Sequence, residues 1–599
     1  MNVIASLKIA TGSCYGRPEN CQNIYPGRPQ NRMTPAALAP PPALMTLCLG
    51  GGGVVLSHFN IQAISSIWQG VRSNLRQFLD GRQPMIWLLS IFIGLGVAYA
   101  AILFRIGIGL AQLPWLGLMS ERIGDRLAAL PWWVIILVPT LTGLIIGLML
   151  KFLMPAHRPY GVADVIEARA IKGGRLPVRA GLLSAAITVI SLGGGASAGR
   201  EGPVVHLGAT LASGLARYFE LPSGSVRSLL GCGVAAAVAA SFNAPIAGAL
   251  FALEVVLGHY AMRAFVPVVI SSTIAAVISR AHLGDFPAFS LPHYHIISYW
   301  EFGAFALLGL TCALIAISFQ YAAILAERGA QYVNLPLVLR PMAGGLLVGI
   351  IGVFFPQILG VGYEATDLAL KQHFGLTLLL SLLAAKLAAT AITLAARFGG
   401  GVFSPSLYLG AMTGGAFGLI AAQAFPDFAS SSGLYAILGM GGVAAAVLGA
   451  PISTTLIIFE LTGGFELAIA LLLTISLASG LSQALHGRSF FHWQLGERGL
   501  FLTDGPHKHI VRTLRVREFM TFLEDDEAPF RLDPDGEQPW LTPADTLETA
   551  LRALDRAGDS RVAVIDSNEP GLVIAWASRL DAIELYNKAL IQANIEAYR

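Results

Sequence analysis

An arginine and a glutamate lie side by side in an apolar part of the chain, within the segment Gly199-Arg200-Glu201-Gly202-Pro203. A charged side chain at the centre of a bilayer costs about 2.5 to 3.5 kcal/mol, so such charges usually have a function. The flanking glycines let the backbone bend until its N–H groups point one way, and Pro203 suits the first turn of a helix. A helix N-terminus carries about half a positive charge and binds anions. We therefore predict a site where the Glu201 carboxylate competes with an incoming anion for the same donors. The alternative is that Arg200 and Glu201 only pair with each other.

A second segment, Gly401-Val402-Phe403-Ser404-Pro405, has the same arrangement of glycine and proline but no acid. It offers free backbone N–H groups at Val402 and Phe403. Converging helix N-termini bind an anion strongly enough to replace its hydration, yet weakly enough to release it, because they carry no full positive charge. The two segments together predict an anion site built from helix N-termini.

Both segments belong to a longer internal repeat. The stretch GREGPVVHLGA (199–209) matches GVFSPSLYLGA (401–411), and APIAGALFALE (244–254) matches APISTTLIIFE (450–460), at offsets of 202 and 206 residues. Duplicated halves with interrupted helices place a binding site near the middle of the bilayer, between the repeats. The alternative is that small-residue membrane helices merely share composition.

The composition excludes an ordinary water-soluble enzyme. Only 13% of the 599 residues are charged and 55% are apolar, with a mean hydropathy of +0.65, whereas soluble domains carry roughly 25% charged residues. Many of the 66 glycines lie inside apolar stretches, where an exposed backbone polar group would cost several kcal/mol. We predict an all-α polytopic membrane protein whose broken helices are buried or line a water-filled path, as in channels and transporters. The apolar stretches include 86–104, 132–154, 180–190, 229–257, 302–319, 376–394 and 434–459.

The charges divide the chain into three parts. Residues 501–599 hold 18 of the 36 acidic and 11 of the 39 basic residues, and their alternating short strands and amphipathic helices predict a small α/β domain. We assign 81–500 to the membrane domain and 1–80 to an unstructured N-terminal extension rich in proline and glycine. The net charge of +3, without basic runs interleaved with aromatic residues, gives no case for nucleic-acid binding.

Three segments carry a resemblance to a known family: SLGGGASAGREGP (191–203), GGGVFSP (399–405) and FNAPIAGALFALE (242–254). They resemble the signature motifs of the CLC chloride channels and proton/chloride antiporters. The resemblance implies a homodimer in the lipid bilayer whose subunits conduct independently. Each subunit would have two inverted-topology repeats and its own path for chloride or a similar small anion.

The resemblance also implies roles for individual residues. Glu201 would be the gate, which opens when it is protonated, with Arg200 and Gly202 at the anion site beside it. Val402 and Phe403 would donate backbone N–H groups to the central anion.

Two hydroxyl groups that touch the central anion in the family are missing here. By the resemblance, the serine position falls on Gly161 and the tyrosine position falls on Phe491. Each neutral hydrogen bond contributes about 0.5 to 1.5 kcal/mol. We expect Gly161 and Phe491 to line a weak central site that is held mostly by backbone amides.

A third departure concerns proton coupling. In the family's antiporters an inner glutamate directly follows the glutamate that ends the second motif, whereas here Val255 follows Glu254. Because valine carries no proton, we favour a passive, voltage-gated-type chloride channel gated by Glu201. A weakly coupled proton/chloride antiporter is the alternative, since water could still bring protons to Glu201. Glu254 and Glu460 are interpreted as structural acids at helix ends.

The C-terminal part, 501–599, resembles a single degenerate CBS repeat. Ser578 and Asp581 occupy the positions of its nucleotide-contacting residues. An adenine nucleotide could bind there; support of a dimer, or a degenerate remnant, is the other interpretation. A nucleotide-sensing membrane scaffold without transport is therefore a further alternative function. We expect no other cofactor.

Catalysis and metal binding are not expected. The five cysteines have no metal-ligand spacing, and no Ser/His/Asp or Cys/His arrangement suggests an enzyme. A soluble C-terminal domain, with Arg72, Arg76 and Arg82 before the first span, predicts a multi-pass protein of the inner (plasma) membrane with both termini in the cytoplasm.

Overall fold

The computed structural model describes residues 61–80, 82–120, 122–284, 289, 294–462, 467–500, 510–511, 514–523, 531–532, 538–566, 569 and 571–598. Residues 1–60 of the predicted extension lie outside this set. Residues 61–80, which we expected to be unstructured, form helix α1 (Ile61–Asp80). Apolar residues at Trp68, Val71, Leu75 and Leu79 recur with the three-to-four-residue period of a helix, and the proline-rich composition ends before residue 61.

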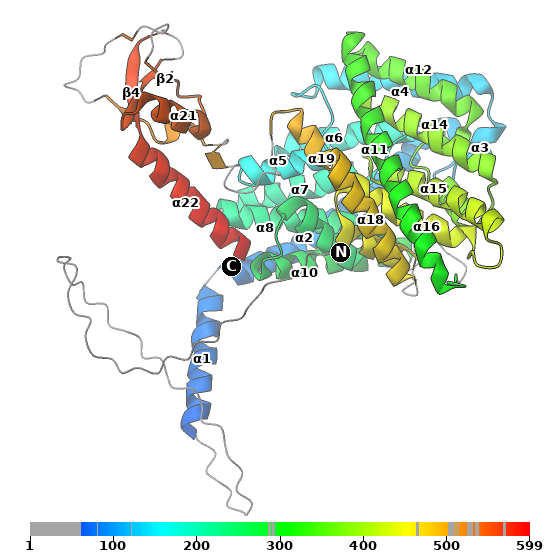
Figure 1. The fold of residues 1–599 in the computed structure, drawn as a ribbon, viewed down its shortest axis with the longest axis horizontal. Helices are drawn as coiled ribbons and strands as arrows, with labels where there is room; N and C mark the ends of the chain where they lie inside the picture. Colours follow the sequence, from blue (N-terminus) through cyan, green and yellow to red (C-terminus); the bar gives the residue numbers. More distant parts are fainter. Residues whose placement is uncertain are drawn as a thin grey trace, which may run out of the picture. The chain divides into compact units, whose positions relative to one another are not determined.

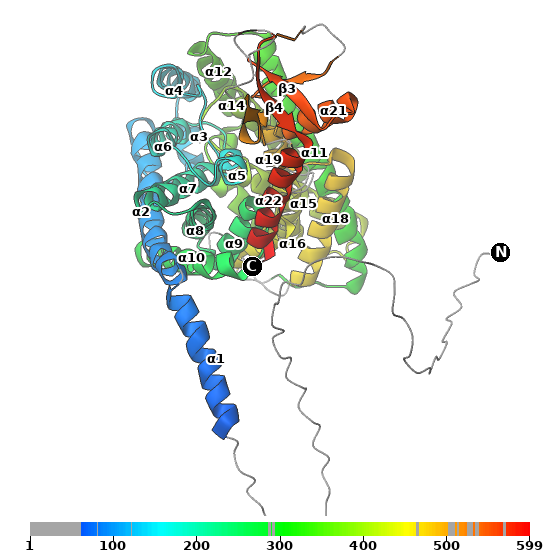
Figure 2. The ribbon, with the colours of Figure 1, turned by 90° about the vertical axis from the view of Figure 1, so that its left-hand side faces the viewer.

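The membrane region is built of helices joined by loops, and its described residues form no β-strand (Figures 1 and 2). As predicted for a multi-pass membrane protein, eight stretches of the described helices are long and apolar enough to cross a bilayer; they contain α2, α4, α8, α10, α11, α14, α15 and α18. The helices of this region are α2 (Gln83–Leu116), α3 (Gly124–Ala129), α4 (Trp132–Phe152), α5 (Val162–Ile171), α6 (Val178–Gly193), α7 (Glu201–Tyr218), α8 (Ser223–Phe242), α9 (Pro245–Phe251), α10 (Met262–Leu283), α11 (Phe302–Tyr332), α12 (Leu339–Phe354), α13 (Tyr363–Leu370), α14 (Leu376–Ala395), α15 (Phe403–Ala424), α16 (Ser432–Leu448), α17 (Pro451–Thr462), α18 (Ala468–His486) and α19 (Phe490–Gly496).

Two of the long apolar stretches are interrupted at matching places in the two repeats. Asn243 ends α8 in the left-handed conformation, with φ of 58°, and Gly449 ends α16 in the same way, with φ of 68°. Two residues later a proline, Pro245 or Pro451, begins the next helix, where its missing N–H costs nothing. The broken helices predicted from the glycine content are therefore present in both halves.

The glycines of the repeat allow two pairs of helices to pack with their backbones in contact. A Cβ atom on Gly208 of α7 would lie 2.4 Å from the carbonyl oxygen of Gly233 on α8, and one on Gly233 would lie 2.3 Å from that of Gly208. In the second half, a Cβ on Gly410 of α15 would lie 2.3 Å from the carbonyl oxygen of Gly439 on α16. Small residues are what membrane helices need for such close approach, which explains why the repeat keeps its Leu-Gly-Ala ends.

Each half caps a broken helix of the other half. Glu254 accepts hydrogen bonds from the backbone N–H groups of Ile452 and Ser453, at 3.1 and 2.7 Å, at the start of α17. Glu460 accepts from Ile246 and Ala247, at 3.1 and 2.8 Å, at the start of α9. Both acids satisfy N–H groups that have no partner within their own helix, so their predicted structural role is confirmed.

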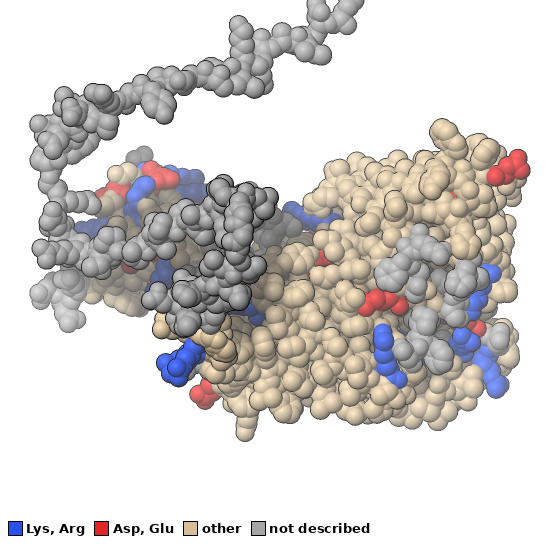
Figure 3. All heavy atoms as spheres, turned by 90° about the horizontal axis from the view of Figure 1, so that it is seen from below, with Lys and Arg blue, Asp and Glu red and all other residues tan. Residues whose placement is uncertain are grey.

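The surface of the helical region is largely uncharged. On the face seen in Figure 3 most of the helical region is uncharged, and its charged side chains gather in one area on the right and at the edges. Large apolar side chains such as Leu103, Phe152, Phe354 and Ile469 are exposed. Contact between this apolar surface and water would be unfavourable, whereas contact with the hydrocarbon of a bilayer is not.

The C-terminal part is a small α/β unit, as predicted. Its described elements are β1 (Thr521–Phe522), β2 (Trp540–Leu541), α21 (Leu547–Ala557), β3 (Arg561–Ile565), β4 (Val573–Ser578) and α22 (Arg579–Tyr598). The strands form one sheet in the order β1-β4-β3-β2, in which only the β2–β3 pair is parallel. Its relation to a CBS repeat stays a prediction.

Replacing Gly410 with alanine is expected to destabilise the membrane region, because the new Cβ would meet the Gly439 carbonyl oxygen at 2.3 Å. Overpacking of this kind costs about 1–3 kcal/mol. Heating the detergent-solubilised protein and following the monodisperse fraction by size-exclusion chromatography should show a lower midpoint. Gly480→Ala on α18 is the matched control, since its Cβ would have no heavy atom within 4 Å. Equal midpoints for the two variants would contradict the packing argument.

Candidate functional site

The two predicted anion-binding segments meet through a pair of backbone hydrogen bonds. The N–H of Gly199 donates to the carbonyl oxygen of Gly401 at 2.7 Å, and the N–H of Gly401 donates to that of Gly199 at 2.7 Å. A Cβ on Gly199 would lie 3.0 Å from the Ser404 nitrogen and 2.9 Å from a carboxylate oxygen of Glu201. Glycine is therefore required for the two segments to approach this closely.

Three helix N-termini converge at this bridge. Helix α7 begins at Glu201 and α15 begins at Phe403, each two residues after its bridging glycine. Helix α5 begins at Val162, and a Cβ on Gly202 would lie 3.8 Å from the Val162 side chain. The first N–H groups of each helix have no acceptor within that helix, so the site concentrates partial positive charge.

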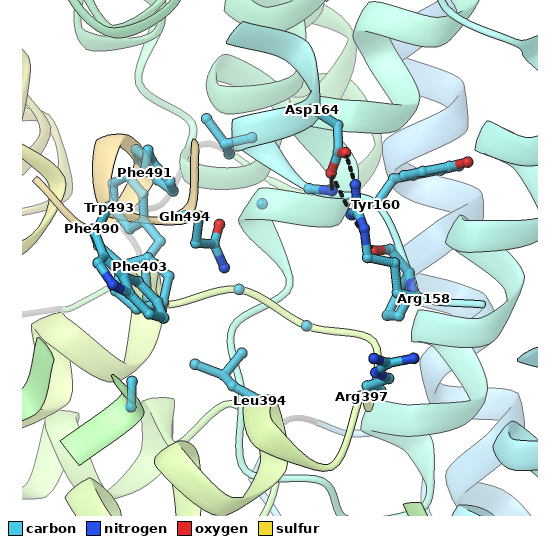
Figure 4. A pocket seen from close by; sticks show the side chains of 18 of the residues that line it. Arg158, Tyr160, Asp164, Leu394, Arg397, Phe403, Phe490, Phe491, Trp493 and Gln494 are labelled. Atoms are coloured by element: carbon cyan, nitrogen blue, oxygen red, sulfur yellow. Dashed lines mark hydrogen bonds and ion pairs between the residues drawn. The ribbon is translucent and has the colours of Figure 1, made fainter. Parts of the chain in front are cut away.

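A cavity of about 340 Å³ lies on one side of the bridge. Six of the residues predicted from the sequence line it: Gly161, Glu201, Gly202, Val402, Phe403 and Phe491. Figure 4 shows an aromatic wall of Phe403, Phe490, Phe491 and Trp493 facing a charged wall of Arg158, Asp164 and Arg397. The structure therefore brings together residues that lie far apart in the sequence around one space.

The charged wall holds the start of α5 in place. Arg158 forms a bidentate pair with Asp164, at 2.6 and 3.1 Å, and Arg498 contacts both Asp164 and Glu167. Asp164 in turn accepts from the N–H of Gly161 at 2.9 Å. At Gly161 itself, a Cβ would have no heavy atom within 4 Å, so the missing side chain leaves the cavity open at that point.

Arg200 and Val255 lie outside this cavity. Arg200 lines a second cavity of about 310 Å³, together with Arg105, Arg122 and Tyr363. Its Nε lies 3.7 Å from Oε1 of Glu201, and its guanidinium lies over the Tyr363 ring at 5.2 Å. Val255 is buried in the π-helical turn Ala252–Leu257 and lines neither of the two cavities.

Glu201 lines the first cavity and contacts two residues of the second, Arg200 and Tyr363. Its side chain is almost fully buried, with 1% exposed, and it lines the first cavity. The Tyr363 hydroxyl, which lines the second cavity, donates to Oε1 of Glu201 at 2.5 Å. The Ser404 hydroxyl donates to Oε2 at 2.5 Å. A carboxylate held at both oxygens thus fills the point where α7 and α15 begin.

Comparison with known proteins decides the family. Residues 142–483 match the family described as "Voltage gated chloride channel". The chain belongs to this family. It is 34% identical over 386 residues to "Putative chloride channel protein ClcB-like" of Ralstonia nicotianae, covering 64% of this chain and 90% of that protein. It is also 31% identical to "Chloride channel protein CLC-e" of Arabidopsis thaliana, and it spans about half (52%) of that protein's length.

The fold agrees with this assignment. A structure described as "a slow cyanobacterial Cl-/H+ antiporter" aligns with a TM-score of 0.61 at 22% sequence identity, over 70% of this chain and 99% of that one. The CLC-type fold predicted from the motifs is therefore confirmed.

Sequence reasoning missed the two hydroxyl groups on Glu201 of this CLC-family protein. Ser404 lies inside the segment 401–405, in which only the backbone N–H groups of Val402 and Phe403 were predicted to bind. Tyr363 lies 162 residues from Glu201, and only the preceding Gly360-Val361-Gly362 marks it as the start of an element. No spacing rule connects residues this far apart, so only the three-dimensional fold reveals the contact.

A buried lysine anchors the loop that carries Tyr363. Lys386 of α14 is fully buried, and its Nζ donates to the carbonyl oxygens of Ile358 and Gly360 at 2.9 and 3.0 Å. The loop then turns at Gly362, whose φ of 91° favours glycine. A fixed loop places the Tyr363 hydroxyl reproducibly against Glu201.

The predicted nucleotide residues of the C-terminal part contact each other. The Ser578 hydroxyl donates to Asp581 at 2.7 Å and accepts from the Asp581 N–H at 3.1 Å, which caps the start of α22. This cap is a sufficient structural reason for both residues, and nucleotide binding stays a prediction.

Replacing Lys386 with methionine is expected to lower the thermal midpoint of the protein, because the loop before Tyr363 loses its charged donor. A hydrogen bond from a charged group contributes about 1.5–3 kcal/mol. Lys371→Met is the control, since Lys371 pairs with Asp367 at a partly exposed i,i+4 position, where a pair is worth about 0.3–0.5 kcal/mol. The anchoring role would be refuted if both variants unfolded at the same temperature.

Proposed function

We propose that the protein conducts chloride or a similar small anion passively across the membrane, and that Glu201 is the gate. The observation that carries this proposal is the position of the Glu201 carboxylate, at the converging N-termini of α7 and α15 and between two cavities. An anion that displaced the carboxylate would gain the N–H groups that are free at these helix starts. The negative charge at the site would then be unchanged, so the exchange would add no uncompensated charge to a medium of low dielectric constant.

The lining of the first cavity favours weak binding. Gly161 and Phe491 offer no hydroxyl group there, so backbone N–H groups at Val402 and Phe403 would supply most of the hydrogen bonds. Conduction needs binding that is favourable enough for entry and weak enough for release. A lining with few hydrogen-bond donors therefore favours release of the anion, as conduction requires, over tight binding.

Passive conduction is favoured over proton-coupled exchange by the position of Val255. A proton reaching Glu201 from the side of the first cavity would have no carboxylate at Val255 to carry it. The relatives named above are described as channels, whereas the structural neighbour is described as an antiporter. Exchange with weak coupling is thus the alternative that the experiment below must separate.

The assembly and its orientation belong to the same proposal. We infer a homodimer in the inner membrane, with one anion path in each subunit. Arg72, Arg76 and Arg82 precede the first span, and basic residues of that kind favour the cytoplasmic side. With both termini in the cytoplasm, the cavity lined by Glu497 and Arg498, which closely precede the C-terminal part in the sequence, would face the cytoplasm.

Reconstitution into liposomes under a chloride gradient tests the proposal when chloride efflux and external pH are recorded together. Chloride efflux without proton movement at a fixed ratio is expected for the wild type. A Glu201→Gln variant mimics the protonated gate. Because its amide is neutral at every pH, this variant should raise efflux at neutral pH by about tenfold or more and lose its pH dependence.

Three results would contradict parts of the proposal. A fixed proton-to-chloride ratio would establish exchange in place of conduction. A Glu201→Gln variant as sensitive to pH as the wild type would remove Glu201 as the gate. Absence of efflux from wild-type protein that is folded in the liposomes would refute transport altogether.

A further inference from the structure

Both carboxylate oxygens of Glu201 are held by side-chain hydroxyl groups. Tyr363 donates to Oε1 and Ser404 donates to Oε2, each at 2.5 Å, and the two hydroxyl oxygens lie 3.4 Å apart. Hydrogen bonds to an ionised acceptor are shorter and about twice as strong as those between neutral groups. Bonds of this length therefore favour the ionised, closed form of the carboxylate.

The two hydroxyl groups come from different elements, and each is held rigidly. Tyr363 is the first residue of α13; its ring contacts Phe289 edge-on at 5.8 Å, and the Lys386 anchor fixes the loop before it. Ser404 is the second residue of α15, which the Gly199–Gly401 bridge holds against the start of α7. Neither donor is a mobile surface group that happens to lie near Glu201.

The charged groups nearest the Glu201 carboxylate are Arg200 and the charged residues that line the two cavities. Arg200 is its neighbour in sequence, with Nε 3.7 Å from Oε1. The remaining charged residues lining the second cavity are Arg105, Arg122, Glu364 and Asp367. Those lining the first cavity are Arg158, Asp164, Glu327, Arg397, Glu497 and Arg498. Both hydroxyl groups lie closer to the Glu201 carboxylate than Arg200 does, at 2.5 Å against 3.7 Å.

We propose that Tyr363 and Ser404 are positioning residues that latch the ionised Glu201 carboxylate in the closed position and thereby set the pH at which the gate opens. The inference rests on the proposed function of Glu201. Protonation of either oxygen weakens it as an acceptor, so the latch and the charge are lost together. The stabilisation is present above the opening pH and is lost as the pH falls through it; without the latch, opening must therefore occur at higher pH.

Chloride efflux from proteoliposomes, measured as a function of pH, tests the latch in the full-length protein. Tyr363→Phe and Ser404→Ala are each expected to move the midpoint of activation up by about one pH unit, a tenfold change in proton concentration that corresponds to about 1.4 kcal/mol. Tyr408→Phe and Ser406→Ala are the matched controls on α15 and should keep the wild-type midpoint. Tyr408 is buried without a hydrogen-bond partner for its hydroxyl in the described structure, and the Ser406 hydroxyl donates to the Phe403 carbonyl.

A second background separates positioning from direct contact with the permeating anion. In Glu201→Ala protein the latch has nothing to hold, so Tyr363→Phe and Ser404→Ala should leave the efflux rate unchanged. Equal changes in rate in both backgrounds would overturn the inference, because the hydroxyl groups would then act on the anion itself. Midpoints equal to that of the wild type, beside a pH-insensitive Glu201→Gln, would overturn the latch alone. A pH-sensitive Glu201→Gln would instead overturn the proposed function.

Discussion

Two hydrogen bonds between Gly199 and Gly401 join the halves of the membrane region at the point where α7 and α15 begin. They form only because the surrounding positions lack side chains. A Cβ on Gly399 would lie 2.5 Å from the Thr188 hydroxyl oxygen, and one on Gly400 would lie 2.3 Å from the Ala198 Cβ. Once the two segments are joined, α7 and α15 begin close to each other, each with N–H groups that have no acceptor within its own helix.

The N–H groups at these two helix starts have no acceptor within their own helices. Buried N–H groups without acceptors are costly in a membrane, where water is scarce. The Glu201 carboxylate lies at the start of α7 and accepts hydrogen bonds from the hydroxyl groups of Tyr363 and Ser404. An anion that took its place would bring the same charge to the free N–H groups of these helix starts. In the closed form the carboxylate therefore places its negative charge at helix starts that carry partial positive charge, and opening requires an anion in its place.

Local motifs predict the parts of the site that depend on backbone geometry. The Gly-rich segments around Glu201 and Phe403 were recognisable because a glycine and a proline at fixed spacing determine where a helix begins. The breaks at Asn243 and Gly449 follow from the same chemistry, and the repeat shows that they recur in both halves. Glu254 and Glu460 were predicted as structural acids, although not that each caps a helix of the other half.

Contacts between distant elements could not be predicted in this way. The hydroxyl groups of Tyr363 and Ser404 reach Glu201 because α13, α15 and α7 pack together, and no periodicity in the sequence records that packing. Lys386 shows the same limit, since its two carbonyl acceptors lie on a loop in a different part of the chain. Helix α1 was not predicted because residues 61–80 were grouped with the proline-rich residues 1–60. The apolar residues of 61–80 nevertheless recur with the spacing of a helix.

The most direct test is to locate an anion at the bridge. Crystals of the wild type and of Glu201→Gln grown in bromide would show the ion by its anomalous scattering. An anomalous peak beside the N–H groups at the start of α7 and α15, at the place of the Glu201 carboxylate and stronger in Glu201→Gln, is the predicted result. Bromide elsewhere in the two cavities, with none at this position in either protein, would contradict the claim that an anion and the Glu201 carboxylate exchange at one site.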